Sequence, residues 1–167
     1  EADERMRPTT SLDVKDLIQA ALDAIAPLAQ DYEARVSFDV PKESIEIFAD
    51  KDQLQQVFTN LIENAIKYSG KGAQVGLELG APEFDPRLGE TAVTITINDN
   101  GPGIDPIHLP RLTERFYRID NHRSRELGGT GLGLAIVKHI LNRHRGRLKI
   151  DSSLGQGSQF SVILPSA

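Results

Sequence analysis

The chain has 167 residues, of which 39% are hydrophobic and 26% are charged, proportions that are typical of a globular domain with its own core. Its formal net charge of −5 argues against nucleic acid or an anionic membrane surface as a partner. The lack of cysteine excludes disulfides, thiolate catalysis and cysteine metal sites, and no apolar run is long enough to span a bilayer.

The start of the chain predicts its domain organisation. Residues 1–10 are charged and polar, which is typical of the end of a linker, and one folded domain is expected over residues 11–167. Because the first residue is Glu1 and not Met, we expect a piece of a longer, cytoplasmic protein. A segment outside this chain would then anchor any membrane-bound parent in the inner membrane.

The first expected elements are a helix and two strands. From Leu12 onward apolar residues recur at helical spacing, with Asp13 or Ser11 as the candidate cap. Pro27 is expected to kink or end this helix. Two strands are expected to follow, over Arg35–Val40 and Ser44–Ala49.

The second helix has the clearest boundaries. Asp50 and Gln53 form a capping-box pattern at its start, and Gly70 is expected to end it. One face of this helix is apolar from Leu54 to Ile66. Two further strands are expected on either side of a surface loop, over Ala73–Leu79 and Thr91–Asn98.

The last third of the chain begins with a long irregular segment. Residues 99–130 are rich in turn residues and arginine, with a short helix capped by Asp105 and Pro106, and a segment of this length is typical of a functional lid or of disorder. A third helix over 131–145 ends at Gly146, and two strands follow, over Arg147–Asp151 and Ser158–Leu164. We therefore predict an α+β fold, a two-layer sandwich in which a mixed sheet of about five strands is covered on one face by three helices.

Polar residues share the side of the second helix opposite its apolar face. Asn60, Asn64, Lys67 and Tyr68 follow one another at helical spacing. Amide oxygens suit Mg²⁺, a lysine supplies a point charge for phosphate, and a tyrosine ring can cover a base. The alternative is an ordinary solvated helix face.

A carboxylate and a glycine bend follow the strand at Thr91–Asn98. Asp99 could accept a hydrogen bond from an exocyclic amine such as that of adenine, whereas a guanine carbonyl would face a negative charge there. The alternative is a β-turn in which the aspartate only stabilises the turn.

Arginines and glycines then precede the third helix. Arg115, Arg118, Arg123 and Arg125 could neutralise charge on a bound triphosphate, or could belong to a basic surface loop. The glycine run 128–133 ends at the start of a helix, where unpaired N–H groups bind phosphate, but a plain loop or cap has the same composition.

The order of these segments resembles the catalytic ATP-binding domain of sensor histidine kinases, a member of the Bergerat fold with an ATP lid. Its asparagine, first glycine, phenylalanine and second glycine boxes read here as NLIENAIKY, DNGPGI, RFYR and GGTGLGLAIVKHI, and GQGSQFSVILP is similar to its closing turn and strand. The resemblance covers about residues 11–165, and the stretch from RFYR to the third helix looks most like the phosphate-regulon branch of that family.

The resemblance implies a role for each matching residue. It implies that Asn64 and Asn60 hold Mg²⁺, Lys67 contacts phosphate, Tyr68 covers the adenine and ribose, and Asp99 receives the adenine amine. Catalysis would involve Asn60, Lys67 and Arg118, with Arg118 near the γ-phosphate. The other nucleotide contacts that it implies are Gly101, Gly103, Ile104, Tyr117, Gly129, Thr130, Gly131, Leu132, Gly133 and Leu134.

The resemblance also implies a kinase and not a hydrolase. Gyrase-type and chaperone ATPases of the same fold carry a glutamate general base where this chain has Asn60, and an amide cannot take a proton from water. None of the histidines has the sequence context of a phosphoacceptor. His108 and His122 fall in the lid, His139 is expected to pack in the core, and His144 is expected as a cation near a helix C-terminus.

The expected partners are therefore ATP, the dimerisation and phosphoacceptor helices of the parent protein, and a response-regulator receiver domain. No nucleic acid and no membrane contact by this domain are expected. Two alternatives stay open, a nucleotide-sensing module without catalysis and a serine kinase of the anti-sigma type with the same fold.

Overall fold

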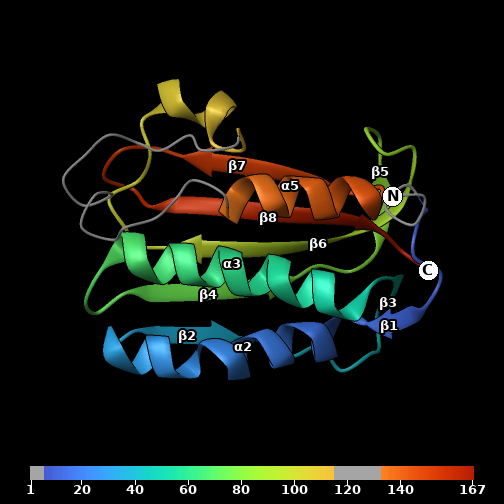
Figure 1. Ribbon diagram of the computed structural model, residues 1–167, viewed down its shortest axis with the longest axis horizontal. Helices are drawn as coiled ribbons and strands as arrows, with labels where there is room; N and C mark the ends of the chain where they lie inside the picture. Colours follow the sequence, from blue (N-terminus) through green and yellow to red (C-terminus); the bar gives the residue numbers. More distant parts are fainter. Residues whose placement is uncertain (1–5, 115–132) are drawn as a thin grey trace.

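The structure, a computed structural model, describes residues 6–114 and 133–167 and has two layers (Figure 1). The main sheet has six strands, and its path runs β2 (Arg35–Phe38), β4 (Gln74–Leu79), β6 (Glu90–Asp99), β8 (Ser158–Pro165) and β7 (Arg147–Ser152). β5 (Glu83–Asp85) pairs with β6 off this path. Only the β2–β4 pair is parallel among the described strands, so the sheet is mixed as predicted.

Three helices lie across one face of this sheet in Figure 1, α2 (Val14–Asp31), α3 (Lys51–Ser69) and α5 (Gly133–Arg143). A 3₁₀ helix, η1 (Pro106–Arg111), follows β6 and lies beyond the β7 edge. The α+β sandwich and its helix-covered sheet are therefore confirmed. Within the described residues, none of the helices is both long enough and apolar enough to cross a bilayer.

The core lies between the helices and the sheet because strand residues alternate between the two faces. In β6, Ile95 and Ile97 are buried against the helices, whereas Asn98 lies on the other face. From α3, Leu54, Phe58 and Ile62 are completely buried, and each such side chain stabilises the fold by about 1.5–3 kcal/mol.

The ends of α3 follow the sequence closely. The Asp50 side chain accepts a hydrogen bond from the Gln53 N–H at 3.0 Å, which is the predicted N-cap. At the other end Gly70 has φ 82°, a conformation that glycine adopts without strain, and its N–H bonds to the Ile66 carbonyl. A separate two-stranded sheet consists of β1 (Ser11–Asp13) and β3 (Glu46–Phe48). α3 runs from this sheet at one end of the molecule to the loop after β6 at the other (Figure 1).

Three local predictions need correction. Pro27 does not end the first helix, because Leu28 and Ala29 beyond it pack against the core while Pro27 itself is exposed. The segment Ser11–Asp13 is a short strand, β1, which pairs with β3 (Glu46–Phe48). The predicted surface loop contains β5, a strand too short to leave a periodic pattern.

The residues before Ser11 also contact the domain. The Thr10 carbonyl accepts a hydrogen bond from the Ala49 N–H at 2.9 Å, and the Arg7 guanidinium lies 5.8 Å from the centre of the Phe48 ring. Residues 6–10 therefore run along the two-stranded sheet. Where the linker ends stays a prediction.

Candidate functional site

The polar face of α3 is present as the spacing predicts. Asn60, Asn64, Lys67 and Tyr68 are each half-buried, while the apolar residues between them are buried in the core. Helical geometry places these four side chains along one stripe, which ends beside the loop that follows β6. The four predicted α3 residues therefore share one partly covered surface.

Asn60 joins this stripe to the start of α5. Its Nδ2 donates a hydrogen bond to the Gly133 carbonyl oxygen at 3.4 Å. Gly133 is the last glycine of the run 128–133 and the first residue of α5. The contact therefore brings the amide-bearing face of α3 to the place where the glycine run enters a helix.

The donor set on α3 fits a magnesium ion that binds a triphosphate. The hydrogen bond of Asn60 uses its amide nitrogen and does not involve its amide oxygen, which is the atom that Mg²⁺ prefers. Within residues 6–114 and 133–167 no group of three or more histidine, cysteine or acidic side chains could hold a metal. Amide oxygens could complete a coordination shell that water and phosphate mostly supply.

Asp99 stands at the end of β6, next to the C-terminal end of α3. The strand alternation that points Asn98 away from the helices turns Asp99 toward them. Its Oδ1 accepts a hydrogen bond from the Gly101 N–H at 2.9 Å. Partial burial raises the pKa of this carboxyl, and the N–H groups of Gly101 and Ser158, with the neighbouring Ser69 hydroxyl, oppose that rise.

Glycines hold the loop after β6 against the β7–β8 turn. Gly103 has φ 77°, and a Cβ atom there would lie 2.0 Å from the Ser153 carbonyl oxygen. At Gly157, with φ 78°, it would lie 2.1 Å from the Asp99 carbonyl oxygen. Such distances exclude any side chain, so both glycines allow two backbones to touch.

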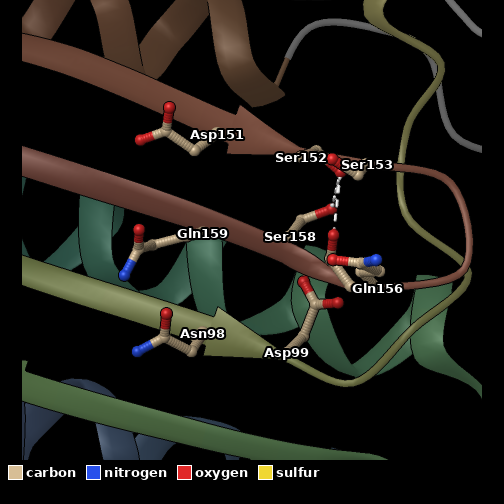
Figure 2. A pocket seen from close by; sticks show the side chains of 9 residues that line it. Asn98, Asp99, Asp151, Ser152, Ser153, Gln156, Ser158 and Gln159 are labelled. Carbon is tan, nitrogen blue, oxygen red and sulfur yellow. Dashed lines mark hydrogen bonds between the residues drawn. The ribbon is translucent and has the colours of Figure 1, made fainter.

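Hydrogen bonds reinforce this contact between the two loops. The Ser152 hydroxyl accepts a bond from the Ile104 N–H at 2.8 Å and donates to the Gly157 carbonyl at 2.9 Å. Ser152 and Ser158 hydroxyls lie 2.7 Å apart (Figure 2). The closing turn of the chain thus fixes the loop that carries Asp99, a role the sequence did not indicate.

The far face of the sheet carries a separate polar row. In Figure 2, α3 lies behind the strands, and the side chains of Asn98, Gln159 and Asp151 line the near face in register across β6, β8 and β7. They border a shallow hollow of about 400 Å³ that reaches Asp99 at its edge. None of these three residues was predicted to belong to the site.

The remaining predicted residues divide into two groups. Ile104 and Leu134 are half-buried and pack against the core. A Cβ atom at Gly133 would meet nothing within 4 Å, so the described residues do not by themselves require glycine there. Other predicted residues lie outside the described residues, namely Tyr117, Arg118, Gly129, Thr130, Gly131 and Leu132, with Arg115, His122, Arg123 and Arg125.

The predictions for two histidines were the wrong way round. His139 is exposed and does not pack in the core. His144 is 1% exposed, and burial lowers its pKa, so it is a neutral packed side chain and not a solvated cation. His144 follows Val137, Ile140 and Leu141 at helical spacing, so it continues the buried face of α5 beyond Arg143.

Residues that the sequence analysis missed include Ser69, Ser152 and Ser158 around Asp99. The pair of glycines at 155 and 157 was a visible signal for the closing turn, but no pattern pointed to Ser69. Its hydroxyl oxygen is buried and makes no hydrogen bond within the described part of the chain. Such an atom next to a candidate ligand site is notable because buried hydroxyls are nearly always bonded.

Comparison with known proteins gives consistent results. A sequence profile for histidine kinase-, DNA gyrase B- and HSP90-like ATPases matches residues 49–167. The phosphate regulon sensor protein PhoR of Pseudomonas aeruginosa is 44% identical over 127 residues, which are 76% of this chain and 27% of PhoR. The sensor protein kinase WalK of Staphylococcus aureus is 42% identical over 127 residues, which are 76% of this chain and 29% of WalK.

Solved structures agree with these relatives. A mycobacterial sensor histidine kinase, MprB, aligns with a TM-score of 0.75 and 28% identity over 95% of this chain and 97% of that chain. Full-length ShkA in complex with AMPPNP aligns with a TM-score of 0.76 and 27% identity over 96% of this chain and 32% of that chain. The chain spans less than a third of PhoR and WalK.

Proposed function

Because the chain belongs to the family of histidine kinase-, DNA gyrase B- and HSP90-like ATPases, we propose that it holds Mg²⁺-ATP between α3 and the loop after β6 and gives the γ-phosphoryl group to a histidine elsewhere in its parent protein. The chain is an ATP-binding catalytic domain of the sensor histidine kinase type, in agreement with the resemblance to the phosphate-regulon branch. The metal, the residue roles and the acceptor are the proposed parts.

One observation supports the position of the nucleotide most directly. The hydrogen bond from Asn60 to the Gly133 carbonyl brings the polar stripe of α3 and the end of the glycine run into contact. Phosphate binds readily where a glycine run enters a helix. A triphosphate there would have Asn60, Asn64 and Lys67 on one side, while its base would extend along α3 toward Tyr68 and Asp99.

Magnesium fits this arrangement through amide oxygens. Asn64 lies one helical turn beyond Asn60 on the same stripe. Mg²⁺ supplies charge neutralisation on the phosphates when it is bound. Asn64 and Asn60 would hold the ion, while Lys67 would place a positive charge near the phosphate oxygens and Arg118 would act from the lid.

The reaction proposed is transfer and not hydrolysis. Asn60 occupies the position of the general base in the hydrolytic members of the fold, and an amide cannot accept a proton from water at neutral pH. In the transfer the bond from the γ-phosphorus to the β–γ bridging oxygen breaks as a bond to an imidazole nitrogen forms, and ADP leaves.

The acceptor histidine is proposed to lie on a dimerisation helix of the parent protein. Of the histidines that the structure describes, His144 is buried between two helices and uses both ring nitrogens in hydrogen bonds. His108 and His139 are more accessible but lie on η1 and α5 of this domain. A response-regulator aspartate would then receive the phosphoryl group, on the cytoplasmic side of any membrane that anchors the parent.

The test is phosphoryl transfer from γ-labelled ATP to the natural protein that contains this domain and its preceding histidine segment. We expect labelled protein whose label is stable to base and labile to acid, as phosphohistidine is. Labelled protein should be lost in the Asn64→Ala variant. Nucleotide binding without any label would instead favour a sensing module, and an acid-stable label would favour a serine kinase.

A further inference from the structure

Ser69 carries a hydroxyl that lies beside the Asp99 carboxylate. It is the last residue of α3, and its Oγ is buried from solvent. Within residues 6–114 and 133–167 this oxygen makes no hydrogen bond. Alanine is the better helix former and would avoid a buried polar atom, so a hydroxyl at this position indicates a hydrogen-bonding role.

The position of Gly101 shows what lies around that hydroxyl. A Cβ atom at Gly101 would lie 2.8 Å from Ser69 Oγ and 3.0 Å from Asp99 Oδ1. The hydroxyl and the carboxylate therefore border the same small space, which exists because residue 101 has no side chain. The Gly101 N–H also donates to Asp99 Oδ1 at 2.9 Å, so the carboxylate is held from the loop side.

The neighbours of the Asp99 carboxylate favour its ionised form. Burial raises its pKa, whereas the N–H groups of Gly101 and Ser158 and the Ser69 hydroxyl lower it. The ionised carboxylate is an acceptor only, and its hydrogen bond to an exocyclic amine is stronger than that of a protonated carboxyl. Ser69 is the member of this set that comes from α3 and not from the loops.

We propose that Ser69 is a positioning residue for recognition of a 6-aminopurine nucleotide, acting through Asp99. Its hydroxyl donates toward the Asp99 carboxylate when nucleotide is bound, which turns one oxygen toward the purine amine and keeps the group ionised. Ser69, which would orient the Asp99 carboxylate, directly follows Tyr68, which would cover the base, so both lie in the last turn of α3. This proposal rests on the proposed function.

The experiment compares Ser69→Ala and Ser69→Thr with the unchanged chain by calorimetric titration. Two ligands are used, Mg²⁺-ATP and the Mg²⁺ complex of purine riboside triphosphate, which lacks the amine. Loss of a hydrogen bond to a charged group corresponds to about a tenfold loss of affinity. We expect Ser69→Ala to bind ATP about tenfold more weakly and the analogue as before, and Ser69→Thr to restore ATP binding.

A pH series separates this role from a structural one. As the pH is lowered, ATP affinity should fall at a higher pH in Ser69→Ala than in the unchanged chain, because the Asp99 carboxyl then protonates more easily. Ser37→Ala is the matched control, since Ser37 is exposed on β2. Equal ATP affinity and an equal pH midpoint in Ser69→Ala would overturn the proposal. Failure of the unchanged chain to bind ATP would instead overturn the proposed function.

Discussion

The imidazole of His144 completes the N-terminal cap of α3. Its Nε2 accepts a hydrogen bond from the Asp50 backbone N–H at 3.0 Å. In a capping box the side chain of Gln53 would accept this bond. The Gln53 side chain instead accepts a bond from Arg143 at 2.7 Å, and Arg143 also pairs with the Asp50 carboxylate at 3.3 Å. The start of α3 is thus fastened to the end of α5.

This contact predicts how stability depends on pH. Burial lowers the pKa of His144, with Arg143 and Arg7 acting in the same direction and the Ile140 carbonyl and Asp50 opposing them. The unfolded chain therefore takes up the proton at a higher pH than the folded chain does. The free energy of unfolding should be greatest above about pH 6.5 and should fall as the pH is lowered through that value.

The measurement is denaturant unfolding across this pH range. His144→Gln keeps an acceptor for the Asp50 N–H but cannot titrate, so it should lose most of this pH dependence. His144→Ala should lose about 2 kcal/mol at neutral pH, because the Asp50 N–H is left without its partner. A pH dependence in His144→Gln equal to that of the unchanged chain would contradict the assignment.

Two glycine substitutions should have opposite effects. Gly103→Ala should destabilise the fold by more than about 1 kcal/mol, because φ is 77° and the new Cβ would strike the Ser153 backbone. At Gly133 a new Cβ would contact no atom of the described residues, so the melting temperature of Gly133→Ala should be unchanged or higher. Its ATP affinity should fall if phosphate approaches the backbone there. Thermal melting and ATP titration of the two variants check this, and normal ATP binding by Gly133→Ala would remove Gly133 from the site.

The fold was largely predictable because its long elements bury strongly periodic faces. The helix at Lys51–Ser69 has a cap, an apolar stripe and a terminal glycine, and the structure places it within a residue of the expected bounds. The short strands β1 and β5 were missed because their pairing partners, and not their own sequences, determine them. Pro27 does not end its helix because packing beyond it outweighs the hydrogen bond that it removes.

The site was predictable where residues share one helix and less so where the fold brings loops together. The stripe from Asn60 to Tyr68 follows from helical geometry alone. Asp99 and the loop after β6 are far in the sequence from the serines that lie beside them, Ser69, Ser152 and Ser158, and serine is too common for any spacing to reveal them. The hydrogen bond from the Asp50 N–H to His144 could not be foreseen either, because Asp50 lies 94 residues earlier.

The identity of residue 60 predicts whether the domain hydrolyses ATP. Asn60→Glu should place a carboxylate general base next to the bound triphosphate and should raise the rate of ATP hydrolysis, with about 10²-fold as the low end of what a positioned base contributes. Asn60→Gln, which is matched in size but cannot accept a proton, is the control. Phosphate release from the two variants is the measurement, and equal rates would count against the proposed position of the γ-phosphate.

Asp99 predicts the choice of purine. Asp99→Asn replaces an acceptor-only group with an amide that can also donate to a guanine carbonyl. ATP affinity should fall by about tenfold or more, and the preference for ATP over GTP should narrow. Competitive displacement of a fluorescent ATP analogue by each nucleotide checks this. An unchanged ratio of the two affinities would remove Asp99 from base recognition.

The most direct test is calorimetric titration of the chain with ATP, in the presence of Mg²⁺ and again with the metal chelated, for the unchanged protein and for Asn64→Ala. We predict that Mg²⁺ strengthens ATP binding to the unchanged chain, and that Asn64→Ala loses this gain while its melting temperature is preserved. ATP binding that is equally tight with and without Mg²⁺, or an Asn64→Ala variant with the full metal-dependent gain, would contradict the placement of the metal and the triphosphate on the polar face of α3.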